Sequence, residues 1–96
     1  MPVFEWDEEK NIKLQNDRGI SFEKVIVSIE AGKILDIAVH PNIHKYPGQQ
    51  IIVVEIENYA YCVPVMKSKE SIFLKTIYPS RKATKKFLNN KNNDQK

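Results

Sequence analysis

The chain has 96 residues, 42% of them hydrophobic, which supports one small domain with a modest core. Its single cysteine, Cys62, excludes an internal disulfide and a thiolate metal cluster, and a cytoplasmic setting is expected. The N-terminus has no signal-peptide pattern, and nowhere do about 18 apolar residues run together. Neither export nor contact with a membrane is therefore expected.

The net charge of +3 is unevenly distributed along the chain. Residues 1–66 hold 6 Lys/Arg against 10 Asp/Glu, whereas residues 67–96 hold 9 against 2. Positive charge concentrated in this way favours binding to phosphate backbones or to an acidic protein. The alternative interpretation is that these lysines only solvate a terminal helix.

The N-terminal third predicts one short strand and two helices. Val3–Trp6 has strand character, and a polar helix is expected from Glu8 to Arg18. A second helix, from Ser21 to Ala31, carries apolar residues at the spacing i, i+3, i+4, i+7, namely Phe22, Val25, Ile26 and Ile29. We expect this second helix to pack on the core.

From Ile34 the apolar period changes from 3.6 to 2, which predicts strands. The first of them places on one side Leu35, Ile37 and Val39. Ile51–Ile56 is almost wholly apolar and β-branched, as is typical of a central strand, and Tyr59–Met66 returns beside it. Because strands joined by short turns are antiparallel neighbours, we expect an α+β fold. It should have an antiparallel sheet of four to five strands, two N-terminal helices and one C-terminal helix.

The stretch from Ser71 to Leu88 joins a strand to a basic helix. Its first half alternates, with Ile72, Leu74, Thr76 and Tyr78 predicted on one side and Phe73, Lys75 and Ile77 on the other. Pro79 then stops the strand, and Ser80 is a good N-cap for a helix with an apolar stripe. We assign residues 1–88 to the domain and residues 89–96 to a flexible polar tail.

The sequence offers no metal or cofactor motif. Pro41 lies between His40 and His44, so the two imidazoles cannot share one face of a helix, and no metal site is expected. The three glycines stand apart, which excludes a glycine-rich phosphate loop. Cys62 lies in a predicted strand, where a small buried hydrophobe is favoured over a nucleophile.

The candidate functional residues that remain are cations, imidazoles and phenols, which suit metal-independent cleavage of RNA. This reaction needs a base for the 2′-hydroxyl, cations for the phosphorane and an acid for the leaving 5′-oxygen. We predict a catalytic set of His44, Lys75 and Arg81, with Tyr78 or His40 for the second proton transfer. The RNA backbone is assigned to Lys82, Lys85, Lys86 and Lys45. For His40, which precedes a proline, the alternative is a capping or half-buried side chain.

Three short blocks of sequence carry a resemblance to a known family. They are Phe-Glu-Trp-Asp-Glu-Glu-Lys-Asn at 4–11, Gly-Ile-Ser-Phe-Glu at 19–23, and Ser-Arg-Lys-Ala-Thr-Lys-Lys at 80–86. In this order they resemble the BrnT family of bacterial type II toxins. The resemblance implies a RelE-like fold, an endoribonuclease activity that stops growth, and neutralisation by a cognate DNA-binding antitoxin.

Two positions depart from the usual pattern of that family. Its members carry an arginine near the start of the central strand, where this chain has Gln49 and Gln50, and another in the last strand, where Lys75 is nearest. Two functions therefore stay open, a ribonuclease toxin and a non-catalytic module that binds nucleic acid or antitoxin as a co-repressor. In either case we expect an acidic or amphipathic antitoxin segment to cover the basic surface of Arg81, Lys82, Lys85 and Lys86.

Overall fold

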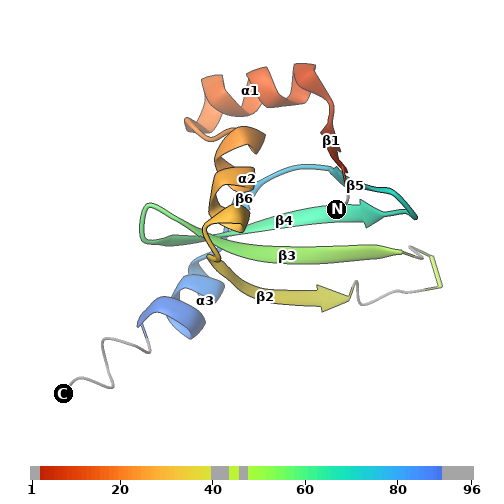
Figure 1. Cartoon of the computed structure of the whole chain (residues 1–96). Helices are drawn as coiled ribbons and strands as arrows, with labels where there is room; N and C mark the ends of the chain where they lie inside the picture. The colour runs from red at the N-terminus through yellow and green to blue at the C-terminus, as the bar shows by residue number, and fades with distance from the viewer. Residues whose placement is uncertain (1–2, 40–43, 46–47, 90–96) are drawn as a thin grey trace.

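The computed structural model describes residues 3–39, 44–45 and 48–89 (Figure 1). Along the chain lie β1 (Val3–Trp6), α1 (Glu8–Arg18), α2 (Phe22–Glu30), β2 (Ile34–Val39), β3 (Gln49–Ile56), β4 (Tyr59–Lys67), β5 (Ser71–Leu74), β6 (Tyr78–Pro79), α3 (Arg81–Thr84) and the π-helical turn η1 (Lys85–Asn89). The predicted α+β class is confirmed. No helix in the described part of the chain is long and apolar enough to cross a membrane.

The six strands form one sheet in the order β1-β5-β4-β3-β2, with β6 also paired to β4. The sheet is mixed, because β1 runs parallel to β5, with Phe4 beside Ile72 and Trp6 beside Leu74. The expectation of a wholly antiparallel sheet was therefore wrong at this edge. Short turns determine only the pairing of consecutive strands, whereas β1 pairs with a strand far along the sequence.

Local signals place the first two helices as predicted. The Asp7 carboxylate accepts a hydrogen bond from the Glu9 backbone N–H at 3.0 Å, and α1 ends at Gly19, whose φ of +67° is the left-handed conformation that glycine favours. The Ser21 hydroxyl oxygen accepts from the Lys24 N–H at 3.2 Å and begins α2. The caps of the two helices are thus separated by one residue, which makes a sharp corner.

That corner is locked by residues from the first two sequence blocks. The fully buried Asn11 side chain accepts from the Phe22 N–H at 2.8 Å and donates to the Glu23 carboxylate, also at 2.8 Å. The Trp6 ring stacks on Phe22 with centroids 5.6 Å apart. The first two sequence blocks therefore fix the position of α1 relative to α2.

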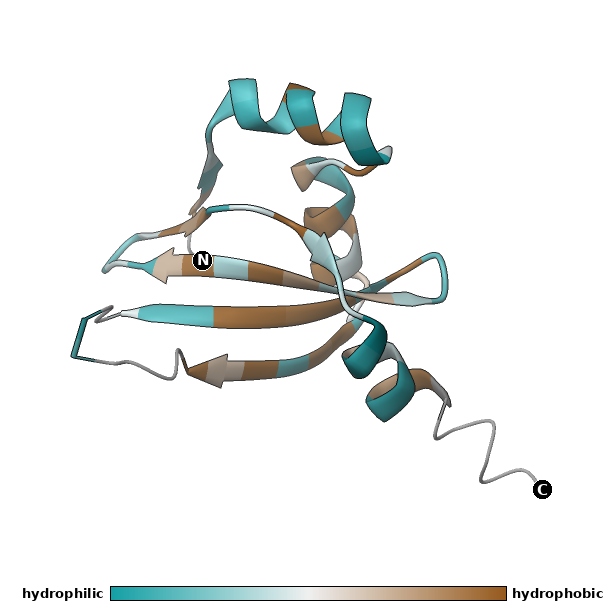
Figure 2. Cartoon of the chain, turned by 180° about the vertical axis from the view of Figure 1, so that it is seen from behind, coloured by the Kyte–Doolittle hydropathy of each residue, from teal (hydrophilic) through white to brown (hydrophobic). Residues whose placement is uncertain are grey.

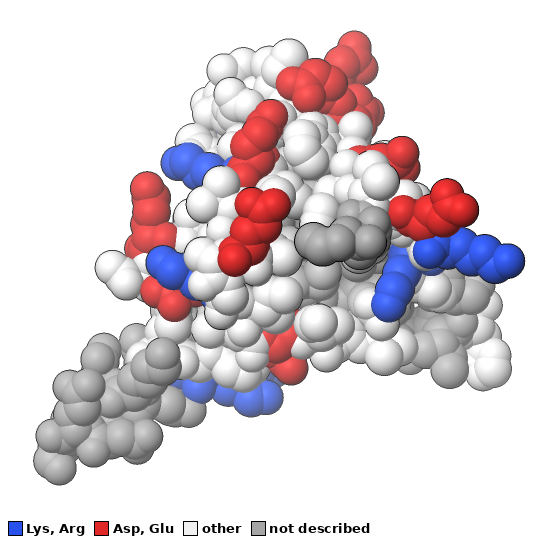
Figure 3. All heavy atoms as spheres, in the orientation of Figure 1, with Lys and Arg blue, Asp and Glu red and all other residues white. Residues whose placement is uncertain are grey.

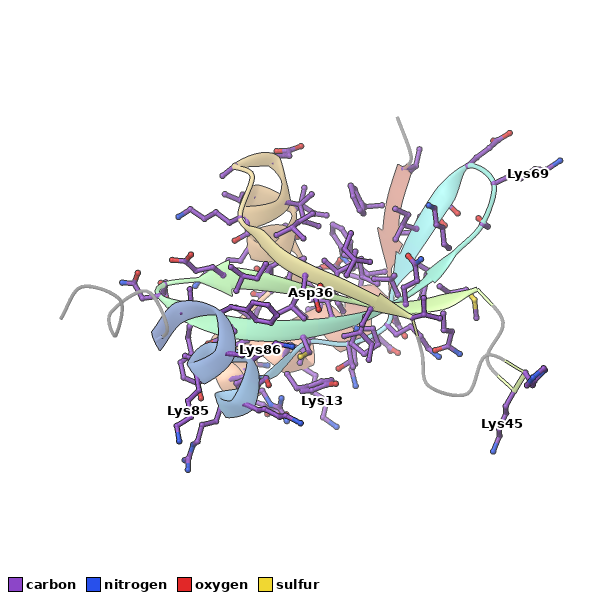
Figure 4. The ribbon with its side chains drawn as sticks, turned by 90° about the horizontal axis from the view of Figure 1, so that it is seen from below. Lys13, Asp36, Lys45, Lys69, Lys85 and Lys86 are labelled. Carbon is purple, nitrogen blue, oxygen red and sulfur yellow. The ribbon has the colours of Figure 1, made fainter. Side chains whose placement is uncertain are left out.

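The helices divide the sheet into two unlike faces (Figures 1 and 4). The core face packs against α1 and α2 through a cluster made of Leu14, Ile20, Phe22, Val25, Ile52, Val54, Ile56, Val63, Val65, Leu74 and Ile77. The opposite side, which we call the open face, carries α3 and η1 at one end. There Ala83, Phe87 and Leu88 pack over Val53, Ala60 and Cys62. Viewed from behind, the segment of α3 and η1 is hydrophilic over most of its length and apolar near its end (Figure 2).

The predicted alternation fails in two places. A bulge between Ile34 and Asp36 puts Leu35 on the open face, while Ile37 stays level with Ile52 on the core face. After Leu74 the regular strand ends, so Ile77 is buried in the core and Tyr78 lies on the open face. Both residues thus lie on the side opposite to the one predicted, and Tyr78 shares its face with Lys75.

Candidate functional site: a row of cations and rings on the open face

Exposed cations and aromatic rings follow one side of β4 on the open face. Phe73 lies beside Met66, the Lys75 N–H donates to the Pro64 carbonyl at 2.9 Å, and Tyr78 lies beside Cys62. The Ser80 N–H then donates to the Ala60 carbonyl at 2.9 Å, which puts the start of α3 at the N-terminal end of β4. The side chains in this row, hereafter the β4 row, are Phe73, Lys75, Tyr78 and Arg81, and all four are exposed.

Lys75 is held across β4 by a residue of the next strand. Its ammonium donates to the Gln49 side-chain oxygen at 3.2 Å, and Gln49 itself is only 8% exposed. This hydrogen bond to a buried amide oxygen restricts the flexible lysine side chain to one direction over the sheet. Gln49 and Lys75 thus lie side by side although they are 26 residues apart in the sequence.

Tyr78 lies in the middle of the β4 row and is 38% exposed. Burial of its phenol raises the pKa above its ordinary value of 10.0, and the neighbouring Cys62 thiol raises it further. Tyr78 is therefore neutral at physiological pH and can donate a hydrogen bond to a phosphate or an alkoxide oxygen. Cys62 is buried beneath it, in agreement with the structural interpretation of this cysteine.

A buried hydroxyl joins α3 to the sheet and so positions Arg81. The Thr84 hydroxyl donates to the Ser80 carbonyl at 2.8 Å and accepts from the Ala60 N–H at 2.9 Å. The Ser80 hydroxyl oxygen accepts from the Ala83 N–H at 3.0 Å and begins the helix. Four exposed cations follow on this anchored segment, namely Arg81, Lys82, Lys85 and Lys86. By contrast, acidic side chains gather over α1 and α2 (Figure 3).

The loop between β2 and β3 lies at the other end of the sheet. Lys45 projects from it far from Lys85 but on the side that carries α3 (Figure 4). His44 beside it is exposed, whereas His40 lies outside the described residues. Six residues of β4 separate the two ends, which is roughly 20 Å at about 3.3 Å per residue. The structure therefore places Lys75, Tyr78 and the start of α3 in succession along β4, whereas His44 lies at the end of the sheet opposite to Arg81.

Two members of this surface are absent from the sequence-based site, Gln49 and Phe73. The sequence did contain a signal for Phe73, because Phe73 and Lys75 were predicted on the same side of a strand. Gln49 had no such signal, since its contact with Lys75 spans three strands. Among the described residues, no group of three or more His, Cys, Asp or Glu side chains is placed to hold a metal ion.

Comparisons with models of protein families, with curated proteins and with solved structures found no match to this chain. The case for its function therefore depends on the three sequence blocks and on the geometry of the open face.

Proposed function

We propose that this chain is a BrnT-like, RelE-fold toxin of a type II toxin–antitoxin pair and cleaves RNA on the open face of its sheet. The observation that carries the proposal is the β4 row, in which Lys75, Tyr78 and Arg81 follow one another on a surface that no described helix covers at the Lys75 end. Cations alternating with hydrogen-bond donors suit a phosphodiester chain. No cofactor is needed for this reaction.

The geometry favours a scissile phosphate beside Lys75. His44, the predicted proton-transfer residue, lies at the end of the sheet where β3 begins, and Lys75 is directed towards Gln49 at that end. In this assignment Lys75 stabilises the phosphorane and His44 takes the proton of the 2′-hydroxyl. Tyr78 donates to the leaving 5′-oxygen, and Arg81 holds the next phosphate together with Lys82 and Lys85.

Induction of the chain alone should arrest growth and should yield RNA fragments with 5′-hydroxyl ends. Lys75→Ala should lower the cleavage rate by about a hundredfold to a thousandfold, because it removes the positive charge that stabilises the phosphorane. Arg81→Ala should also lower cleavage, mainly by weakening the binding of RNA. Arg81→Ala should melt at the parent temperature, since its side chain is exposed. Lys75→Ala should melt slightly lower, because the buried Gln49 oxygen loses its donor. Lys10→Ala, on α1, is the matched control and should remain toxic. Full toxicity of both site variants at equal abundance would refute the assignment.

A second candidate function is binding without cleavage. It is favoured by the separation of His44 from Arg81, which leaves no described imidazole at the α3 end of the β4 row. A co-repressor or RNA-binding module of this fold should bind RNA in a salt-dependent manner, produce no 5′-hydroxyl ends, and leave growth unaffected when induced.

The proposed partner is a small DNA-binding antitoxin with an acidic or amphipathic segment. Arg81, Lys82, Lys85 and Lys86 are exposed on one short helical segment and offer such a segment a concentrated positive surface. A gene for this partner should lie next to the gene for the chain, and its co-expression should restore growth. Growth arrest that persists with the product of every adjacent gene would contradict this pairing.

A further inference from the structure

Phe73 is an exposed aromatic residue that does not pack in either hydrophobic cluster. It is 38% exposed on the open face, although its strand neighbour Leu74 is fully buried on the core face. Its cross-strand neighbour Met66 is 37% exposed. Neither residue belongs to one of the two packed clusters, so together they form an exposed apolar platform on the open face.

The platform is bordered by a cation on one side and a carboxylate on the other. Lys75 is two residues along the same strand and therefore on the same face, with its ammonium fixed by Gln49 at 3.2 Å. Glu5 lies level with Phe73 on the adjacent strand β1 and is exposed. A single patch thus presents a flat apolar ring, a positive group and a negative group.

These three groups match the three parts of a nucleotide. A base can stack on the Phe73 ring, the phosphate attached to it can bind Lys75, and an exocyclic amine of the base can donate to the Glu5 carboxylate. An acidic peptide would be repelled by Glu5. A wholly apolar protein segment would bury both charges without a partner.

We propose that Phe73 and Met66 form a nucleobase subsite for single-stranded RNA, with a preference for bases that carry an exocyclic amine. This inference rests on the proposed RNA-binding function and adds to it a stacking position and a base preference. Stacking on an aromatic side chain tolerates every base, whereas the Glu5 carboxylate distinguishes cytosine, with its amine, from uracil, with a carbonyl at the same position.

The test is a set of titrations with 2′-O-methyl octanucleotides, which cannot be cleaved through their 2′-oxygen. Phe73→Ala should weaken binding of oligo(C) by about 5-fold to 150-fold, the range for loss of one base stack. The affinity for inorganic polyphosphate, which has no bases, should be unchanged. Phe73→Tyr should restore oligo(C) binding. Ile37→Ala, which truncates a 53% exposed apolar residue on the core side of β2, is the matched control.

A fluorescence measurement reports the stack directly. The only natural tryptophan, Trp6, is stacked on Phe22 on the core side, so a Phe73→Trp protein carries one new, exposed reporter. Its emission should be quenched by oligo(C) and unaffected by polyphosphate. The parent should bind oligo(C) more tightly than oligo(U), and Glu5→Gln should narrow that difference.

Three results would overturn the proposal. Equal losses of oligo(C) and polyphosphate binding in Phe73→Ala would mean that the patch is only a cation surface. Unchanged RNA affinity with lost antitoxin binding would assign the ring to a protein interface. In both cases, loss of cleavage in Arg81→Ala would leave the ribonuclease function standing. If the parent binds no oligonucleotide at all, the proposed function and the subsite fall together.

Discussion

The two faces of the sheet differ in how far they expose neighbouring residues of one strand. On β5, Leu74 is fully buried under the helices, while Phe73 beside it is exposed on the open face. The core face is closed by two helices with complete caps, and the open face is covered only where α3 and η1 reach it. The fold thus separates the residues that stabilise it from those that are free to contact a ligand. Substitutions on the two faces should therefore affect different measurements.

The largest effect on stability is expected at Val25, which is fully buried on α2. Val25→Asp places an unpaired charge in the core and should lower the free energy of unfolding by about 4 kcal/mol. Val27→Asp, on the same helix at a position that is 65% exposed, should change it by less than about 0.5 kcal/mol. Urea unfolding measures both. Similar midpoints for the two variants would mean that α2 does not pack on the sheet as described.

A smaller effect is expected at the corner between α1 and α2. Asn11→Ala leaves the buried Phe22 N–H without its acceptor and should destabilise the protein by about 1–3 kcal/mol. Asn16→Ala, at an exposed position of the same helix, is the control and should be nearly neutral. Thermal unfolding distinguishes them. A neutral Asn11→Ala would show that this buried bond contributes nothing.

The junction of α3 with the sheet should affect both stability and activity. Thr84→Val keeps the shape of the side chain but removes the acceptor of the Ala60 N–H and should lower the free energy of unfolding by about 1–2 kcal/mol. Because Thr84 also positions the segment that carries Arg81, RNA cleavage should fall as well. Thr84→Ser retains the hydroxyl and should preserve both properties. Loss of stability in Thr84→Val with full activity would separate the anchor from the site.

The smallest effect is a dependence on pH at the helix corner. The hydrogen bond from Asn11 lowers the pKa of Glu23 below its ordinary value of 4.5 in the folded protein. The resulting stabilisation is complete above the pKa of the unfolded chain and is lost as the pH falls through the lower folded pKa. Stability should therefore decline in acid below about pH 4.5, and Glu23→Gln should decline less. The difference should be small because water screens this exposed carboxylate. Parallel acid profiles would contradict the assignment.

Local chemistry explains why much of the fold could be predicted from the sequence. Asp7 and Ser21 cap the helices through hydrogen bonds within three residues, and the stripe that includes Phe22 and Val25 faces the core as its spacing predicts. The contact of Asn11 with Phe22 could not be predicted, because it depends on the angle between two helices. The parallel pairing of β1 with β5 was missed because strands distant in sequence have no turn to fix their order.

The candidate site was predicted in part. Lys75 and Arg81 were selected for their charge, and the path of the chain puts them on one surface. The sides of Ile77 and Tyr78 were reversed because β5 ends at Leu74, after which simple alternation no longer applies. Gln49 reaches Lys75 across β4, a contact that exists only once three strands are in register. Periodicity describes a single strand and contains no information about such contacts.

The parallel pairing of β1 also determines when the sheet can be completed during translation. β1 is translated long before its partner β5, which follows all other strands of the sheet except the short β6. Until then Phe4 and Trp6 lack their neighbours Ile72 and Leu74. The β4 row is encoded in that same final third of the chain. A product that ends before β5 therefore lacks both the strand that pairs with β1 and Lys75.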